Sequence, residues 1–114
     1  MDKLHCAFKI RFAKDDIFFG VGVITLLKLT EQFESLNAAA KNMNLSYSKA
    51  TRMINNTEKA LGFKLLDRKI GGANGGGSKL TAECKEFIEV YDVFFYEINK
   101  NTEKLFNELF SKYI

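Results

Sequence analysis

The sequence predicts a mostly helical fold with a small β component. Apolar residues recur at helical spacing in residues 46–61 and 81–114, whereas 4–12 and 63–80 contain short strand-like stretches bounded by turn residues. The chain has 114 residues, of which 46% are hydrophobic and 27% charged, as is typical of a globular protein with one core. We therefore expect a domain over residues 1–80, with a long helix over 81–114 packed on it.

The amino-terminal third predicts two strands and a first helix. In LHCAFKIRF, residues 4–12, Phe8, Ile10 and Phe12 alternate with basic residues, which is the period-two pattern of a half-buried strand. The residues AKDD then predict a turn, and IFFG predicts a short second strand that pairs back. From Gly22 the spacing changes to the broad apolar stripe of a helix.

Two further helices are predicted in close succession. Ser35 stands where an N-cap belongs, and the helix that it begins extends to about Met43. Asn44 tolerates the left-handed conformation, Ser46 offers a new N-cap, and Gly62 supplies the stop of the third helix. Three consecutive alanines permit a close crossing of the two helices. The pattern predicts a helix-turn-helix.

The third helix, over about residues 46–61, is the expected recognition helix. In a helix-turn-helix the amino-terminal residues of the second helix face base edges in the major groove. Arg52 is suited to guanine and Asn55 to adenine. A tight helix pair also occurs in proteins that do not bind DNA, so this pattern alone leaves both readings open. The residues expected to contact bases are Ser46, Tyr47, Ser48, Lys49, Thr51, Arg52 and Asn55.

Residues 63–80 predict a β-hairpin with basic arms, which makes the unit a winged helix-turn-helix. Five glycines occupy the seven positions 71–77, and glycine lets the main chain approach phosphates and offer its N–H donors. Residues 41–79 carry eight basic and two acidic side chains, a plausible footprint for a polyanion, although a solvated basic face would look the same. The wing residues expected to contact DNA are Arg68, Lys69, Gly72, Asn74, Gly75, Gly76, Ser78 and Lys79.

Residues 81–114 predict one long helix, because they contain neither glycine nor proline and begin with Thr81 as a cap. About 34 helical residues would extend about 50 Å, farther than a domain of this size can cover. We expect a second copy of the chain to bury the remaining apolar surface, giving a homodimer. The residues expected at this interface are Phe87, Tyr91, Phe94, Phe95, Ile98, Leu105 and Leu109.

Several other classes of function are disfavoured. Gly72 and Gly77 have the spacing of a nucleotide-phosphate loop, but Ser78 precedes Lys79 in the wrong order for that motif. One histidine and two distant cysteines do not close a structural zinc site. We expect no enzyme, no metal and no cofactor.

The sequence also predicts the cellular compartment of the protein. It has no apolar run long enough for a membrane span and no signal peptide, so we expect a cytoplasmic protein with free thiols at Cys6 and Cys84. A redox role for these two cysteines stays open.

The stretch SLNAAAKNMNLSYSKATRMI, followed by LLDRKIGGANGGGSKLT, resembles the amino-terminal DNA-binding domain of the molybdate-responsive ModE regulators. The resemblance covers about residues 4–100 and implies a winged-helix dimer joined through its long helix, with a core also found in LysR-type regulators. Two positions depart from that family, since Thr51 stands in place of a usual tryptophan and Cys84 in place of a usual glycine. The oxyanion-binding module of the larger members is not expected here, so molybdate sensing is not implied.

The sequence therefore predicts a sequence-specific double-stranded DNA-binding transcriptional regulator that acts as a homodimer on an inverted repeat. The alternative is a protein–protein adaptor that keeps the winged-helix scaffold without reading DNA. The operator, the sign of regulation and the identity of any effector stay open.

Overall fold

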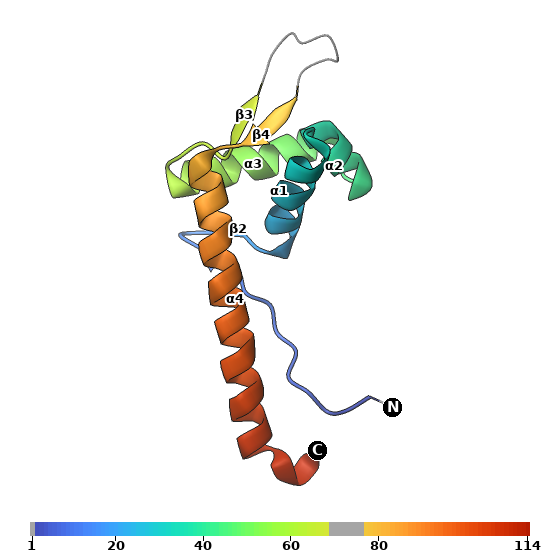
Figure 1. Ribbon diagram of the computed structural model, residues 1–114, viewed down its shortest axis with the longest axis vertical. Coiled ribbons are helices and arrows are strands. Elements are labelled where there is room, and N and C mark those ends of the chain that lie inside the picture. The colour runs from blue at the N-terminus through green and yellow to red at the C-terminus, as the bar shows by residue number, and fades with distance from the viewer. Residues whose placement is uncertain (1, 69–76) are drawn as a thin grey trace.

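The computed structural model describes residues 2–68 and 77–114, and helices predominate in them (Figure 1). The mostly helical fold with a small β component is confirmed. In chain order the elements are β1 (Phe12–Ala13), β2 (Ile17–Phe19), α1 (Val21–Phe33), α2 (Leu36–Asn42), α3 (Tyr47–Leu61), β3 (Leu66–Arg68), β4 (Ser78–Leu80), α4 (Ala82–Leu109) and the 3₁₀ turn η1 (Ser111–Tyr113).

The first hairpin is shorter than predicted. β1 and β2 are antiparallel, with Phe12 opposite Phe19, but the predicted strand over residues 4–12 enters the sheet only at its end. β2 gives way to α1 at Gly20, so no backbone lies opposite the earlier residues to complete a strand ladder. The prediction of a strand was wrong for residues 4–11. We call residues 2–11 the arm.

The helix boundaries follow the predicted capping residues. The Ser35 hydroxyl accepts a 3.0 Å hydrogen bond from the amide of Ala38, and the Ser46 hydroxyl accepts one of 3.1 Å from the amide of Lys49. Gly62 ends α3 with φ 85°, a conformation that glycine adopts without steric cost. Local chemistry therefore determines where α2 and α3 begin and end.

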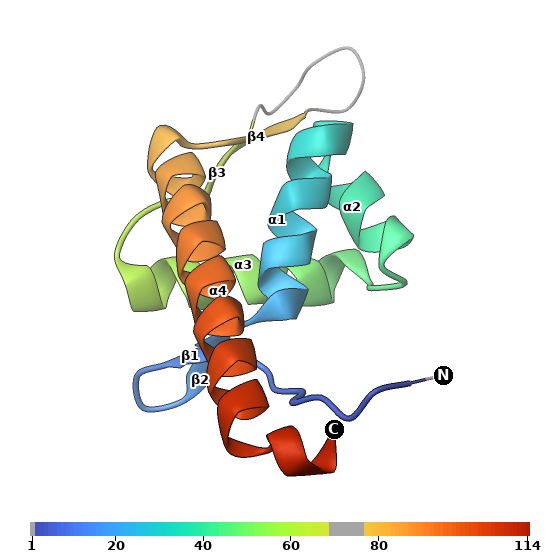
Figure 2. The same cartoon turned by 60° about the horizontal axis from the view of Figure 1, so that its bottom comes forward.

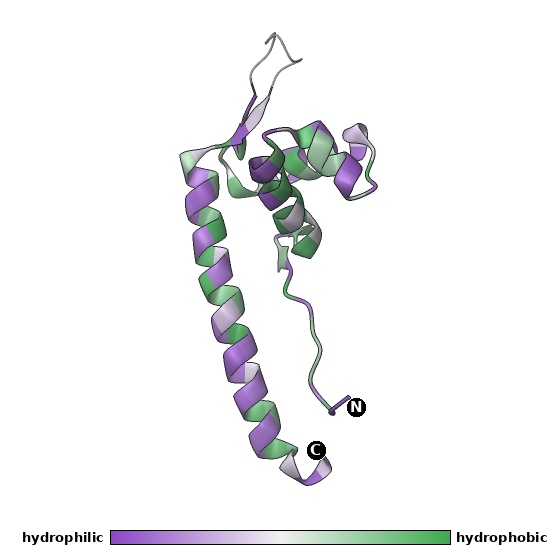
Figure 3. Ribbon diagram, turned by 45° about the vertical axis from the view of Figure 1, so that its right-hand side comes forward, coloured by the Kyte–Doolittle hydropathy of each residue, from purple (hydrophilic) through white to green (hydrophobic). Residues whose placement is uncertain are grey.

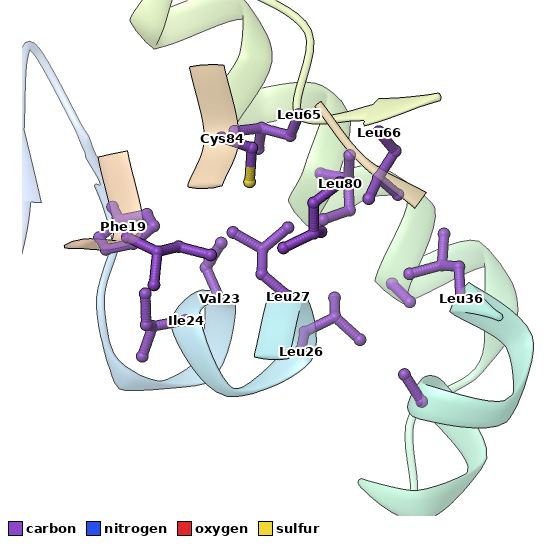
Figure 4. Packing of buried hydrophobic residues seen from close by; sticks show 14 of the residues in the cluster. Phe19, Val23, Ile24, Leu26, Leu27, Leu36, Leu65, Leu66, Leu80 and Cys84 are labelled. Carbon is purple, nitrogen blue, oxygen red and sulfur yellow. The ribbon is translucent and has the colours of Figure 1, made fainter. Parts of the chain in front are cut away.

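One apolar cluster joins all four helices to the second hairpin (Figure 4). Leu26 and Leu27 of α1 are fully buried at its centre. Ala39, Ala40 and Ala50 are also fully buried, and their small side chains let α2 and α3 cross closely. The second hairpin adds Leu66 and Leu80, which lie opposite each other, and α4 adds Cys84, Ile88 and Tyr91.

Only the first part of α4 packs on this core, and the rest projects away from it (Figure 2). The molecule measures 61 × 32 × 23 Å, with a radius of gyration of 17.4 Å. A compact domain of this length would have a radius of gyration of about 13 Å. The helix ends at Leu109, five residues before the predicted end, and Phe110 then turns back to stack on Phe106 at 5.0 Å. The prediction of an unbroken helix to residue 114 was therefore wrong at its end.

A strained residue joins α1 to the second hairpin. Glu34 ends α1 in the left-handed conformation, with φ 54°, and its carbonyl accepts a 3.1 Å hydrogen bond from the amide of Ser78. A Cβ on Gly77 would lie only 3.2 Å from the same oxygen, so this close approach favours glycine. The bond attaches the first residue of β4 to the α1–α2 turn.

Replacing Glu34 with glycine is expected to stabilise the protein by about 1 kcal/mol, because glycine removes the steric cost of the left-handed conformation. The free energy of unfolding in urea measures the change. Glu31→Gly, at an exposed position inside α1, is the matched control. Its free energy of unfolding should fall by about 1 kcal/mol. Equal losses in both variants would contradict strain at Glu34.

Candidate nucleic-acid interface

The polar face of α3 is open to solvent along its length. Ser46, the N-cap, and Tyr47, Ser48 and Lys49 in the first turn are exposed, as are Arg52 and Asn55 in the next two turns. The opposite face is buried through Ala50, Ile54 and Thr57. Six of the seven predicted base-contacting residues are therefore free to meet a ligand.

Thr51 is the exception among the predicted base-contacting residues. Its side chain is half-buried, and its Oγ1 atom is enclosed without a hydrogen-bond partner among the described residues. Thr51 lies on the packed flank of α3, and its contact with a base stays a prediction.

Two side chains hold α3 in place on the domain. The Thr57 hydroxyl lies 2.8 Å from the carbonyl oxygen of Met53 and 3.1 Å from that of Phe18, so its single proton is shared between α3 and β2. The Glu58 carboxylate accepts a 2.8 Å hydrogen bond from the amide of Leu65, at the entry to β3. The sequence reasoning missed both roles. A lone acidic residue in the basic stretch 41–62 was the available signal for Glu58.

The described base of the wing is a three-residue antiparallel ladder. Arg68 lies opposite Ser78, and Asp67 lies opposite Lys79. Arg68 and Lys79 are exposed at the end of the domain from which the hairpin projects (Figure 1). Ser78 is buried, with 7% of its surface exposed, and its amide bonds to Glu34. Its side chain packs in the domain, and its contact with DNA stays a prediction.

The rest of the predicted wing contacts lie outside the described residues: Lys69, Gly72, Asn74, Gly75 and Gly76.

The predicted dimer residues fall into two groups. Tyr91 is buried, with 4% of its surface exposed, and Phe87 packs edge-on against Phe19 at 5.2 Å. Tyr91 belongs to the protomer's own core and the half-buried Phe87 packs against it, and their place in an interface stays a prediction. The second group, Phe94, Phe95, Ile98, Leu105 and Leu109, is exposed or half-buried along the projecting part of α4.

Burial shifts the pKa of two side chains, Cys84 and Tyr91, among the described residues. Burial, together with the nearby carboxylates of Glu31 and Glu58, raises the pKa of the Cys84 thiol to about 12. Such a thiol stays protonated and unreactive at neutral pH. Burial also raises the pKa of Tyr91, with Asp92 adding to the effect and Lys28 opposing it.

Within residues 2–68 and 77–114 no cluster of three or more His, Cys, Asp or Glu side chains is placed to bind a metal. Among the helices of this described part, none has the length and apolar character to cross a bilayer.

Comparison with known proteins places this geometry in a family. The profile of a family described as "Bacterial regulatory helix-turn-helix protein, lysR family" matches residues 24–85, more than half of the chain. Transcriptional regulator ModE of Haemophilus influenzae is 39% identical over 70 residues, which cover 61% of this chain and 28% of that protein. DNA-binding transcriptional dual regulator ModE of Escherichia coli is 34% identical over 70 residues, with coverages of 61% and 27%. The resemblance to ModE regulators is confirmed, and the chain spans just over a quarter of these relatives' length.

Solved structures share the fold. The crystal structure of a complex of the CbnR DNA-binding domain with DNA superposes with a TM-score of 0.57 at 23% identity, over 73% of this chain and 90% of that one. Full-length CbnR complexed with its target DNA gives the same TM-score at 21% identity, over 75% of this chain and 28% of that one.

Proposed function

Because the chain belongs to the lysR family of bacterial regulatory helix-turn-helix proteins, we propose that it is a transcriptional regulator that binds double-stranded DNA in a sequence-specific manner. We further propose that it acts as a homodimer on an inverted repeat. The exposed polar face of α3, held on an apolar inner face, is the observation that carries the proposal. The family and the two bacterial relatives are named as regulators, and we propose no enzymatic activity.

The spacing on α3 fits the dimensions of the major groove. Ser48, Arg52 and Asn55 follow one another at intervals of four and three residues, so they lie along one line of the helix surface. Seven residues of helix extend about 10 Å, which is about three base pairs of duplex DNA. Arginine and asparagine make bidentate contacts with guanine and adenine. We propose that these three side chains read one half-site.

Charge is divided between the two ends of the molecule. Residues 41–79 carry eight basic and two acidic side chains, whereas residues 81–114 carry four basic and seven acidic ones. Phosphates attract the first segment and repel the second, which orients the domain with α3 and the wing base toward the duplex. A two-fold dimer of such domains binds half-sites about 34 Å apart, or a multiple of that distance.

The second candidate function is a protein–protein adaptor, favoured by the exposed aromatic residues of α4. An adaptor would bind another protein through α4 and would not recognise a DNA sequence.

Selection of duplexes from a random pool by the purified protein tests the proposal. At about 0.15 M salt, where long-range attraction is screened, the selected pool should contain an inverted repeat. A pool without enrichment, together with weak and strongly salt-dependent binding, would reject sequence-specific regulation and favour the adaptor.

Arg52→Ala is expected to cost about 1–3 kcal/mol of binding free energy on the selected operator and to relax preference at one base pair in each half-site. Lys59→Ala, which removes an exposed positive charge farther along α3, is the matched control and should leave base preference unchanged. Titrations on the operator and on single-base variants measure both effects. Equal losses on all duplexes would reduce Arg52 to a phosphate contact.

Lys79→Ala is expected to weaken binding to every duplex and to lower the slope of log affinity against log salt by about one, since one counterion-releasing contact is lost. Lys104→Ala makes the same charge change on α4 and should leave the slope as it is. An unchanged slope for Lys79→Ala would place the wing base away from the phosphates.

A further inference from the structure

A groove of about 500 Å³ lies where the arm meets the start of α1. The arm contributes Lys9 and Arg11 to its lining, and the segment Ile17–Val23, from β2 into α1, contributes the largest share. Met53 of α3 completes it. The groove therefore joins the arm to the helix that we propose reads DNA, although the two are distant in the sequence.

Two positive charges at this groove are not neutralised by the domain. Lys9 and Arg11 are exposed, and hydrophilic positions such as these lie among hydrophobic ones along the arm (Figure 3). The ion pairs within residues 2–68 and 77–114 are Lys28–Asp92 and Lys64–Glu58. In this described part neither Lys9 nor Arg11 is paired, so both charges are available to an anion.

The stem of Arg11 is held against the backbone at the start of α1. A Cβ on Gly20 would lie 3.2 Å from Cγ of Arg11 and 3.9 Å from its Cδ, so the aliphatic stem crosses Gly20 closely. The next residue, Phe12, stacks on Phe19 with ring centroids 5.5 Å apart. Because the base of the Arg11 side chain is fixed, its guanidinium loses less conformational entropy when it binds a ligand.

Met53 places the groove on the flank of α3 that faces away from the wing. Successive residues of a helix are about 100° apart, so Met53 and Glu58 are about 140° apart around the axis of α3. Glu58 marks the flank of the wing, since its carboxylate accepts a hydrogen bond from the amide of Leu65 at the entry to β3. Arg52 and Asn55 lie between these two flanks on the outward side.

A helix in the major groove has a DNA strand on each side. An α-helix with its side chains is about 10–12 Å across, close to the width of the major groove. Elements on the two flanks of α3 therefore face the two backbones of the duplex. Arg68 and Lys79 lie at the wing base on one flank, and Lys9 and Arg11 lie at the groove on the other.

The chemistry of the groove suits a sugar–phosphate backbone. Ile17 and Val21, both in its lining, are 57% and 54% exposed and offer apolar contacts to the carbon atoms of deoxyribose. Basic side chains beside them attract the phosphate. Lys49 and Asn56, four residues before Met53 and three after it, are exposed along the same flank of α3. The groove is thus continuous with the surface that we propose meets DNA.

We infer that Lys9 and Arg11 bind the sugar–phosphate backbone of DNA, on the strand across the major groove from the one that faces the wing. This inference rests on the proposed function and adds the arm to the DNA-binding surface. The duplex is then held from both sides of α3, which fixes the rotation of the domain about that helix. Contacts to phosphates position the protein and carry no base preference of their own.

The salt dependence of binding tests the two charges. Lys9→Gln with Arg11→Gln should weaken binding to the selected operator and to a scrambled duplex of equal length. The ratio of wild-type to variant affinity should fall by about tenfold between 50 and 200 mM salt, because two phosphate contacts are lost. Preference among single-base variants of the operator should not change.

Two further variants control for charge and for folding. Lys3→Gln with Lys14→Gln makes the same charge change at exposed positions outside the groove lining, and its affinity ratio to wild type should stay constant over the same salt range. Lys9→Arg with Arg11→Lys keeps both charges and should retain the wild-type slope. Circular dichroism should show the same helix content in all three double variants.

Ethylation of DNA phosphates locates the contact on the duplex. With wild-type protein, ethyl groups on both strands beside the major groove should interfere with binding. The Lys9→Gln and Arg11→Gln double variant should lose this interference on one strand, and Lys79→Ala should lose it on the other.

The outcomes separate this inference from the proposed function. Interference on only one strand with wild-type protein, or an affinity ratio that stays constant with salt for the Lys9 and Arg11 variant, rejects a role for the arm while sequence-specific binding stands. If the wild-type protein binds no duplex at any salt concentration, the proposed function and the contact by the arm both fail.

Discussion

The buried hydroxyl of Thr57 shares its proton between the carbonyls of Met53 and Phe18, and the orientation of α3 depends on this interaction. Leaving a buried hydroxyl without a hydrogen-bond partner would cost about 1–3 kcal/mol of stability. The bond therefore favours one position of α3 against the first hairpin. Glu58, the next residue, attaches the same part of the helix to the entry of β3. With its inner face held in this way, α3 keeps its polar face turned outward.

The second hairpin and α4 extend from the domain in opposite directions. The amide of Ser78 bonds to Glu34 and seats β4 beside α1, and Thr81 both caps α4 and donates a 2.7 Å hydrogen bond to the carbonyl of Lys64. The wing base therefore leaves the domain at one end, while α4 projects from the other (Figure 1). The basic residues of α3 and the wing base are thus kept apart from the exposed apolar residues of α4.

Residues whose environment is set within one helical turn were predicted well. Ser35, Ser46 and Gly62 act where the sequence places them, since a cap bonds to amides or carbonyls only a few residues away. The polar face of α3 followed from its helical period in the same way. The burial of Ser78 and Tyr91 did not follow from the sequence, because a polar or aromatic side chain suits either a surface or a core, and only the neighbouring element decides between them.

The sequence by itself determined the helices, their caps, the outward face of α3 and the separation of basic from acidic segments, because these depend on local bonding and on periodicity. The tertiary structure alone decided which of those surfaces stay open. It buried Tyr91 and Ser78, enclosed the Thr51 hydroxyl and left the arm without a strand to pair with. Burial is a property of what packs against a residue, and partners distant in the chain are brought together only by folding.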